Sequence, residues 1–306
     1  MTMLNLNDLF LFVQAVEHGG FTATSRHLGT PKTTISKRVA ELEKSLGARL
    51  IHRTSRSFKL TDAGGAFLQH ARAALIEAES AESAVRQRVG RPSGTVRLTA
   101  AVPIAQFQLA DHLPDLARAC PEITLVVHAT DRFVDLVQEG FDIAVRSHFA
   151  PLPDSTLVQR RLSVEPVLLV AAPAYVASRP ALLAPQDLAG HDGLLTDPAA
   201  HLWRLRDAAG EQVDAAPKPR LVADESRVLL SAAAAGLGIA CLPASICGGA
   251  LDSGTLIRVL PGWIAGTVTT TILMPHRRGQ LPAVRAVVAF LAERLGEDVG
   301  AGGERP

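Results

Sequence analysis

Between positions 28 and 46, apolar residues recur at the three- and four-residue spacing of an α-helix, and this pattern constrains the fold more than any other. It predicts a helix from Lys32 onward with one buried face. The opposite face carries short polar side chains, one alanine and lysines, so it can approach a groove closely while its lysines meet phosphate. The apolar stripe consists of Leu28, Ile35, Val39, Leu42 and Leu46, and the outward face of Thr33, Lys37, Ala40 and Lys44.

A shorter helix is expected just before this one, over Phe21–Leu28, with Ala23 and Leu28 on its inner side. A turn at Gly29-Thr30 separates the two helices, and Pro31 suits the start of the second. Two helices joined by a short Gly-containing turn, the second exposed and basic, match helix-turn-helix geometry. Periodicity alone also allows an ordinary helical hairpin with a solvated charged face.

A basic hairpin is predicted next, because two short apolar runs, Leu50-Ile51 and Phe58-Lys59-Leu60, flank the stretch HRTSRS. A basic hairpin tip beside a recognition helix acts as a wing that reaches the DNA backbone or minor groove. The candidate DNA-binding residues come from the start of the helix and from this tip. They are Pro31, Lys32, Thr33, Thr34, Ser36, Lys37, Arg53 and Arg56.

The charge of the chain is concentrated at this end. The first 60 residues hold nine Lys and Arg against four Asp and Glu, a balance of +5, whereas the other 246 hold 22 against 26, a balance of −4. The formal net charge of +1 hides this asymmetry. A basic N-terminal unit on a mildly acidic body predicts a polyanion partner for one end only.

The sequence LGTPKTTISKRVAELE, followed by LGARLIHRT and LTDAG, resembles the winged helix-turn-helix of LysR-type transcriptional regulators, without a gap from about Leu4 to Gly65. Many members have a serine and a small residue in place of Pro31 and Lys32, and this chain is similar to the Pro-Lys subgroup. The resemblance implies a sequence-specific DNA-binding transcriptional regulator. A small-molecule effector bound between the two lobes of its C-terminal domain would control it.

A long helix is expected from Thr61-Asp62 to about Val89, followed by a hinge at Arg91–Gly94. Small and apolar residues spaced three and four apart form a seam along it. In the LysR family the corresponding helix pairs antiparallel with its mate in a dimer; packing on its own domain is the alternative. The seam residues are Phe67, Ala71, Ala74, Ala78, Ala81 and Val85.

From Thr95 onward strand and helix patterns alternate, which predicts parallel sheets in an α/β domain. Helices are expected at about 104–119, Arg132–Glu139, Ser226–Ala235 and Pro282–Leu295. The chain enters a second lobe near Ser163 and returns in the strand TVTTTILM. This double crossing resembles the periplasmic-binding-protein fold of LysR effector domains.

The expected fold is thus an N-terminal winged helix-turn-helix, all-α with a small β wing, a linker helix and a two-lobed α/β effector domain. The expected boundaries are 1–61 for the DNA-binding domain, 62–90 for the linker and dimerisation helix, and 91–296 for the effector-binding domain. Its first lobe combines 94–162 and 269–296, and its second covers 163–268. A Gly- and charge-rich tail, 297–306, is expected to be disordered.

Ligands of open α/β sheets bind beyond the carboxyl ends of strands and at helix N-termini. LysR regulators line their effector cleft with such loops, many with Ser or Thr where this chain has Ala101 and Val102. Arg146 is the expected counter-ion of an acidic effector such as a carboxylate, and a structural pair with Asp142 or Asp131 is the alternative. Thr130 and Ser226 could equally be helix caps. The candidate effector-binding residues are Ala101, Val102, Thr130, Arg146, Trp203 and Ser226.

Catalytic patterns are missing from the sequence. Gly236-Leu237-Gly238 precedes an apolar strand, whereas a dinucleotide fingerprint follows one, and there is neither a G-x-S-x-G motif nor a histidine pair at metal spacing. We therefore expect no enzyme activity, no metal and no cofactor. The competing hypothesis is an enzyme or transport-type binding protein with the same two lobes, whose N-terminal unit binds proteins.

The expected location is the cytoplasm, at the nucleoid. No run of 18 apolar residues occurs, the N-terminus lacks a signal-peptide pattern, and three cysteines without metal spacing indicate a reducing compartment. Redox sensing through Cys241 and Cys247 is a minor alternative.

The expected partners are double-stranded DNA with a near-palindromic operator, a small-molecule effector, further copies in a homodimer and homotetramer, and RNA polymerase if the protein activates transcription. No membrane is expected as a partner.

Overall fold

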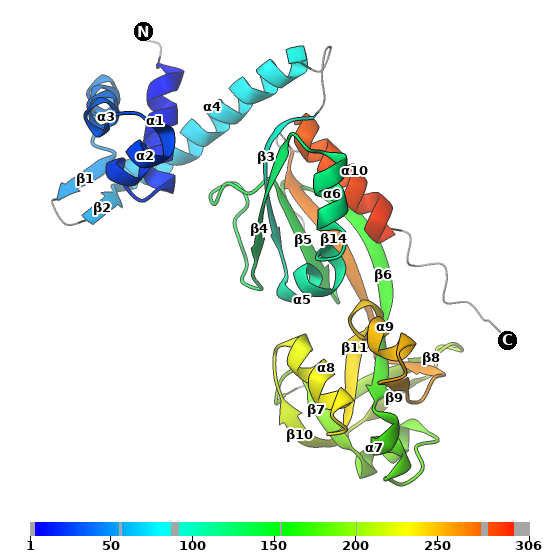
Figure 1. Ribbon diagram of the computed structural model, residues 1–306. Helices are drawn as coiled ribbons and strands as arrows, with labels where there is room; N and C mark the ends of the chain where they lie inside the picture. The colour runs from blue at the N-terminus through cyan, green and yellow to red at the C-terminus, as the bar shows by residue number, and fades with distance from the viewer. Residues whose placement is uncertain are drawn as a thin grey trace.

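The computed structural model describes residues 4–54, 57–86, 92–153, 155–199, 201–276 and 281–296. Figure 1 shows three parts: a small helical unit with a hairpin at the N-terminal end, one long helix, and two α/β lobes arranged end to end. The proposed tail at 297–306 and Arg91 of the proposed hinge lie outside the described residues. No helix among the described residues is long and apolar enough to cross a membrane.

The N-terminal unit has the two predicted helices and the predicted hairpin. The apolar stripe of the helix that begins at Lys32 faces inward, where Ile35 and Val39 are fully buried. It packs on a further helix at the N-terminus, Leu6–Glu17, around Phe12. In the hairpin, Ile51 pairs with Leu60. The elements are α1 (Leu6–Glu17), α2 (Phe21–Leu28), α3 (Lys32–Leu46), β1 (Ile51–Thr54) and β2 (Ser57–Leu60).

The inner side of α2 differs from the prediction. Thr24 is fully buried there, whereas Ala23 is exposed. The Thr24 hydroxyl donates to the carbonyl oxygens of Gly20 at 2.9 Å and Gln14 at 3.2 Å. Because the hydroxyl is satisfied by backbone, a polar side chain lies at the junction of α1 and α2 without a desolvation penalty.

The long helix α4 (Asp62–Arg86) begins where the sequence predicts, and residues 87–91 beyond it are outside the described part. The amide of Gly64 donates to the Thr61 hydroxyl at 2.9 Å, which is the expected N-cap. Gly64 is required here, because a Cβ at this position would lie 2.0 Å from the carbonyl oxygen of Leu50. The first turn of α4 therefore packs directly against the chain that enters the wing.

The first lobe is built on the sheet order β4-β3-β5-β14-β6. The strands β3 and β4 are parallel, as are β3 and β5, whereas β14 runs antiparallel to both of its neighbours. Side chains of α10 such as Val287 and Leu291 complete its core. The elements are β3 (Gly94–Ala100), α5 (Val102–Ile104), α6 (Leu113–Ala119), β4 (Ile123–Ala129), β5 (Ile143–His148), β14 (Thr267–Pro275) and α10 (Pro282–Gly296).

The second lobe continues the same sheet in the order β6-β11-β7-β10 and adds a small sheet of β8, β9 and β13. Its core is separate from that of the first lobe. Strands β8 to β10 and helix α9 were not predicted from the sequence. The elements are β6 (Leu157–Ala171), α7 (Pro173–Ala177), β7 (Asp192–Leu195), β8 (Trp203–Asp207), β9 (Gln212–Ala215), β10 (Lys218–Val222), α8 (Ser226–Ala234), β11 (Ile239–Pro243), α9 (Ala244–Asp252), β12 (Ile257–Arg258) and β13 (Trp263–Ile264).

Two strands connect the lobes, as the double crossing requires (Figure 1). Residues 157–166 of β6 pair with β14, whereas residues 167–170 pair with β11. The exchange of partner falls at Pro166, which lacks an amide hydrogen. The parallel pairing expected from alternating strands and helices is present between β3 and its neighbours β4 and β5 and between β7 and its neighbours β10 and β11, whereas the crossing strands β6 and β14 pair antiparallel, which makes the sheet mixed.

The helix expected over Arg132–Glu139 is also wrong. Its residues form turns, in which the Asp135 carboxylate accepts from the amides of Val137 at 3.0 Å and Gln138 at 2.9 Å. Asp135 starts this turn and Gly140, at φ +77°, ends it, which leaves no length for a helix.

The helical stretch from about 104 to 119 is present but interrupted. A π-helical turn, Ala105–Leu109, follows α5, and α6 begins only at Leu113. Pro114 explains the restart, since it has no amide to continue a preceding helix and fits a first turn.

Candidate DNA-binding face and effector site

The outward face of α3 is exposed along its first two turns. Pro31 is the N-cap, and the side chains of Lys32, Thr33, Thr34 and Lys37 are open to solvent, with Ser36 half-buried. The Lys37 ammonium lies 4.0 Å from Glu41 and its side chain is 77% exposed, so this pair hardly restrains it. Pro31 and the five predicted residues of α3 therefore surround the start of the helix, where most of their side chains are open to solvent.

The position of this face depends on Glu43, which the sequence analysis did not single out. Its buried carboxylate accepts from the amides of Leu50 at 2.9 Å and Ile51 at 3.1 Å. These bonds tie the recognition helix to the first strand of the wing. An acidic residue on the inner side of a basic helix is the signal in the sequence that could have revealed this role.

The wing is described only in part. The backbone of Arg53 lies in β1 opposite Phe58, but the Arg53 side chain and all of Arg56 fall outside the described residues. Both positions belong to the hairpin that follows α3 in the chain. Their contact with DNA stays a prediction.

The predicted seam on α4 divides into two halves. Phe67, Ala71 and Ala74 pack on the core of the N-terminal unit; Ala71 is only 1% exposed, and the Phe67 ring lies 5.6 Å from that of Phe12. This half packs on its own domain, which was the alternative interpretation. Ala78 is half-buried, and the side chains of Ala81 and Val85 lie outside the described part.

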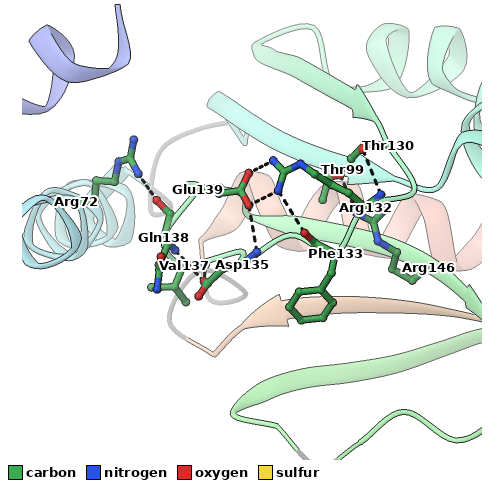
Figure 2. A network of polar contacts seen from close by, with 10 residues as sticks. All are labelled: Arg72, Thr99, Thr130, Arg132, Phe133, Asp135, Val137, Gln138, Glu139 and Arg146. Carbon is green, nitrogen blue, oxygen red and sulfur yellow. Dashed lines mark hydrogen bonds and ion pairs between the residues drawn. The ribbon is translucent and has the colours of Figure 1, made fainter. Parts of the chain in front are cut away.

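Arg146, at the exposed end of β5, is the central residue of the predicted effector site. Its guanidinium lies beside Thr99 (Figure 2) and donates to the Thr99 hydroxyl at 3.0 Å. It also donates to the carbonyl oxygen of the neighbouring residue, Val145, at 3.2 Å. The carboxylates of Asp142 and Asp131 accept from the backbone amides of Arg97 at 2.8 Å and Val102 at 2.9 Å, and an ion pair of either with Arg146 is not among those found between described residues. Burial lowers the pKa of Arg146, the charge of Asp131 raises it, and that of Arg132 lowers it further.

Three further predicted residues surround this end of the first lobe. Ala101 and Val102 precede and begin α5, and the amide of Val102 donates to the Asp131 carboxylate at 2.9 Å. Thr130 follows β4; its amide bonds to the carbonyl of Ala100 at 2.9 Å. The Thr130 hydroxyl accepts weakly, at 3.4 Å, from the amide of Arg132, so it caps a turn and not a helix. All three lie at the carboxyl ends of neighbouring strands β3 and β4.

The second-lobe residues behave differently from each other. Trp203, a candidate effector-binding residue, is 7% exposed and belongs to the core of the second lobe, so it does not offer an open aromatic face to an effector. Its place at the start of a strand, with alternate residues buried, explains this. Ser226 opens α8, but the helix cap is Glu225, whose carboxylate accepts from the amide of Arg227 at 2.9 Å. The half-buried Ser226 hydroxyl makes none of the described hydrogen bonds.

Cys241 and Cys247, the pair considered for redox sensing, are not activated as nucleophiles. Burial raises the pKa of the Cys241 thiol strongly and that of Cys247 to about 11, and both are free. A thiol held protonated is a poor nucleophile, which argues against the redox alternative. No group of three or more metal-binding side chains occurs among the described residues.

A basic winged unit joined to a two-lobed, ligand-binding type of domain defines a class of transcription factor, and comparison with known proteins gives the family. Residues 6–65 match the model of bacterial regulatory helix-turn-helix proteins of the lysR family, and residues 90–296 match the LysR substrate binding domain. The chain therefore belongs to the LysR-type transcriptional regulators. This family consists of DNA-binding regulators, not enzymes.

Individual relatives support this assignment over nearly the whole chain. An HTH-type transcriptional regulator of Xanthomonas campestris pv. campestris is 36% identical, over 96% of this chain and 86% of its own length. The HTH-type transcriptional regulator PtxR of Pseudomonas aeruginosa is 34% identical over 96% and 94%. Among solved structures, CrgA of Neisseria meningitidis has a TM-score of 0.61 at 28% identity, covering 96% of this chain and 100% of that one.

Proposed function

We propose that the chain acts as a dimer, and as a dimer of dimers, on near-palindromic double-stranded DNA. The recognition helix α3 enters the major groove, with Thr33, Thr34 and Ser36 near base edges and Lys32 and Lys37 at phosphates. Pro31 sets the start of the helix, and Arg53 and Arg56 of the wing contact the backbone or minor groove. The observation that carries this proposal is that α3 buries Ile35, Val39 and Leu42 on its inner side and leaves a basic, small-residue face exposed.

The effector is an anion, a carboxylate being the simplest, that binds between the lobes with Arg146 as its counter-ion. The half-buried guanidinium has five N–H donors, of which two have partners in the described part of the chain. Carboxylates accept from such a planar fork in a bidentate way. Ala101, Val102 and Thr130 in the first lobe and Ser226 in the second surround the ligand.

Dimerisation uses the C-terminal half of α4, through Ala78 and the following positions Ala81 and Val85. An alanine seam allows two helices to approach closely but buries little area, so further contacts between effector domains are needed for a tetramer. Effector binding changes the relative placement of the subunits, which requires different affinities for the two assemblies. The protein works in the cytoplasm at the nucleoid, and it contacts RNA polymerase if it activates transcription.

Footprinting on the DNA upstream of a neighbouring divergent gene tests this proposal. We expect protection of two half-sites spaced by about one helical turn, as a two-fold symmetric dimer requires. Expression of a reporter driven by that DNA should change when the effector is added to cells carrying the wild-type chain. Cells carrying the Arg146→Ala variant should show no such change. Protection without symmetry, or an unchanged response with Arg146→Ala, would contradict the assembly and the effector site respectively.

A further inference from the structure

The segment from Asp131 to Gly140 connects the proposed effector site with the helix that carries the DNA-binding unit (Figure 2). At its start, the Asp131 carboxylate holds the first amide of α5 at Val102, 2.9 Å away. The charges of Asp131 and of Arg132 both act on the guanidinium of Arg146. An anion bound at Arg146 therefore changes the electrostatic field at this end of the segment.

The middle of the segment is closed by an ion pair. Both terminal nitrogens of the Arg132 guanidinium donate to the Glu139 carboxylate, Nη1 to Oε1 at 2.8 Å and Nη2 to Oε2. Nη1 also donates to the carbonyl oxygen of Phe133 at 3.2 Å. Glu139 accepts in addition from the amide of Asp135 at 3.3 Å. Beneath these contacts, the buried side chains of Val134 and Leu136 pack with Phe141 and Ala144 in a small cluster at the sheet of the first lobe. The ion pair therefore closes a turn whose apolar side chains are anchored in the lobe, and residues 137–139 are its outer part.

The end of the segment touches the DNA-binding part of the molecule. Arg72 of α4 donates to the carbonyl oxygen of Gln138, and its second nitrogen lies 3.2 Å from the carboxylate of Glu17 at the end of α1. The Arg72 side chain is only 14% exposed. One guanidinium thus joins α1, α4 and the first lobe.

We propose that the segment 131–140 is a relay: an anion bound at Arg146 weakens, through this segment, the contact between the first lobe and Arg72 of α4. This proposal rests on the proposed effector role of Arg146. A bound anion attracts the Arg132 guanidinium in competition with Glu139. When the Arg132–Glu139 pair weakens, the turn opens and the Gln138 carbonyl leaves Arg72. Helix α4 and the N-terminal unit, which pack together, are then released from the lobe as one body.

A double-mutant cycle on the full chain tests the relay without any ligand. The first variant, Glu139→Gln, removes the ion pair with Arg132 that closes the segment. The second, Arg72→Gln, removes the contact between α4 and the Gln138 carbonyl, and the third combines both substitutions. The readout is the Kd for a duplex that the wild-type chain has enriched from a random pool. We expect each single variant to change this Kd in the same direction by about fivefold or more, the lower end of typical coupling. The double variant should show no further change, because both substitutions break one connection.

Two further variants keep the result interpretable. Arg132→Gln removes the same ion pair from its other side and should reproduce the effect of Glu139→Gln. Asp115→Asn removes an exposed ion pair with Arg118 on α6 of the same lobe and should leave the Kd unchanged. Wild-type affinity in both Glu139→Gln and Arg132→Gln, or effects that multiply in the double variant, would overturn the relay. Failure of Arg146→Ala to affect induction would instead remove the effector site and leave this cycle intact.

Discussion

Glu43 shows how a single buried carboxylate determines where a DNA-binding surface points. It lies on the inner side of a helix whose outer side is basic, and it accepts two amide hydrogens from the start of the wing. Bonds from amides to a charged acceptor are stronger than neutral ones. The carboxylate therefore fixes the angle between α3 and the hairpin, and with it the distance between the helix face and the wing.

Replacing Glu43 by Gln should destabilise the N-terminal unit by about 1–3 kcal/mol, because the amides of Leu50 and Ile51, which share one carboxylate oxygen, would then donate to a neutral carbonyl oxygen. Thermal unfolding followed by circular dichroism measures this. Glu41→Gln, on the exposed side of the same helix, is the matched control and should unfold like the wild type. Equal melting temperatures for both variants would show that Glu43 does not hold the wing.

Thr33 is exposed near the start of α3, where side chains reach base edges. Thr33→Ala should relax discrimination at one or two positions of each half-site by about 1–3 kcal/mol for each lost specific contact. Affinities for the selected duplex and for single-position variants of it provide the measurement. An equal loss of affinity on selected and scrambled DNA would assign Thr33 to the backbone.

Arg146→Ala should leave the affinity for operator DNA unchanged and abolish the stabilisation of the protein by a carboxylate effector. We would screen a panel of small mono- and dicarboxylates by thermal shift with the wild-type chain and repeat the hits with the variant. Arg118→Ala, an exposed arginine of the same lobe, is the control. A variant that has a lower melting temperature but still responds to the same hits would indicate a structural role for Arg146.

At the scale of single elements, the sequence predicted those with a strong local pattern and missed those that depend on distant partners. The bounds of α2 and α3 follow from turn residues and periodicity within a few positions, and both match. The wrong helix prediction over 132–139 has a local cause. The Asp135 carboxylate accepts from the amides two and three residues further on, and Gly140, at φ +77°, ends the turn; a pattern of apolar spacing does not reveal either feature. Trp203 entered the proposed site because a core aromatic and a cleft aromatic have the same sequence signal.

The α3 helix and the wing should contribute separately to the dependence of DNA binding on salt. Each of Lys32→Ala, Lys37→Ala, Arg53→Ala and Arg56→Ala should reduce the log–log salt slope by about 1 if the residue meets a phosphate. Lys218→Ala, in the second lobe, should leave the slope unchanged. Wild-type slopes in the Arg53→Ala and Arg56→Ala proteins would exclude the wing from the interface.

The two halves of α4 should respond differently to a charge. Ala74→Glu should lower the melting temperature of the N-terminal unit, because this position packs on its core. Ala78→Glu should instead weaken self-association with little effect on that unit. Sedimentation velocity at micromolar protein distinguishes the two, and intact dimers in the Ala78→Glu protein would remove the proposed seam.

The described part of the molecule has three large cores, besides the small cluster around Val134 and Leu136. The N-terminal unit has one core, each lobe has its own, and the strands β6 and β14 link the lobes. The order of these parts could be predicted from charge distribution, periodicity and family resemblance. The contact of Arg72 with Gln138 could not, because it joins residues 66 positions apart through a backbone carbonyl. Backbone acceptors leave no trace in a side-chain pattern.

Selection of DNA from a random pool of duplexes by the full chain tests most directly whether this protein reads sequence through α3. We expect enrichment of one motif with two-fold symmetry, bound at least about a thousandfold more tightly than scrambled DNA at the same salt concentration. The same selection with Thr33→Ala should return a motif that is degenerate at one or two positions of each half-site. Recovery of no common motif, or equal affinity for every duplex, would contradict sequence-specific recognition by α3.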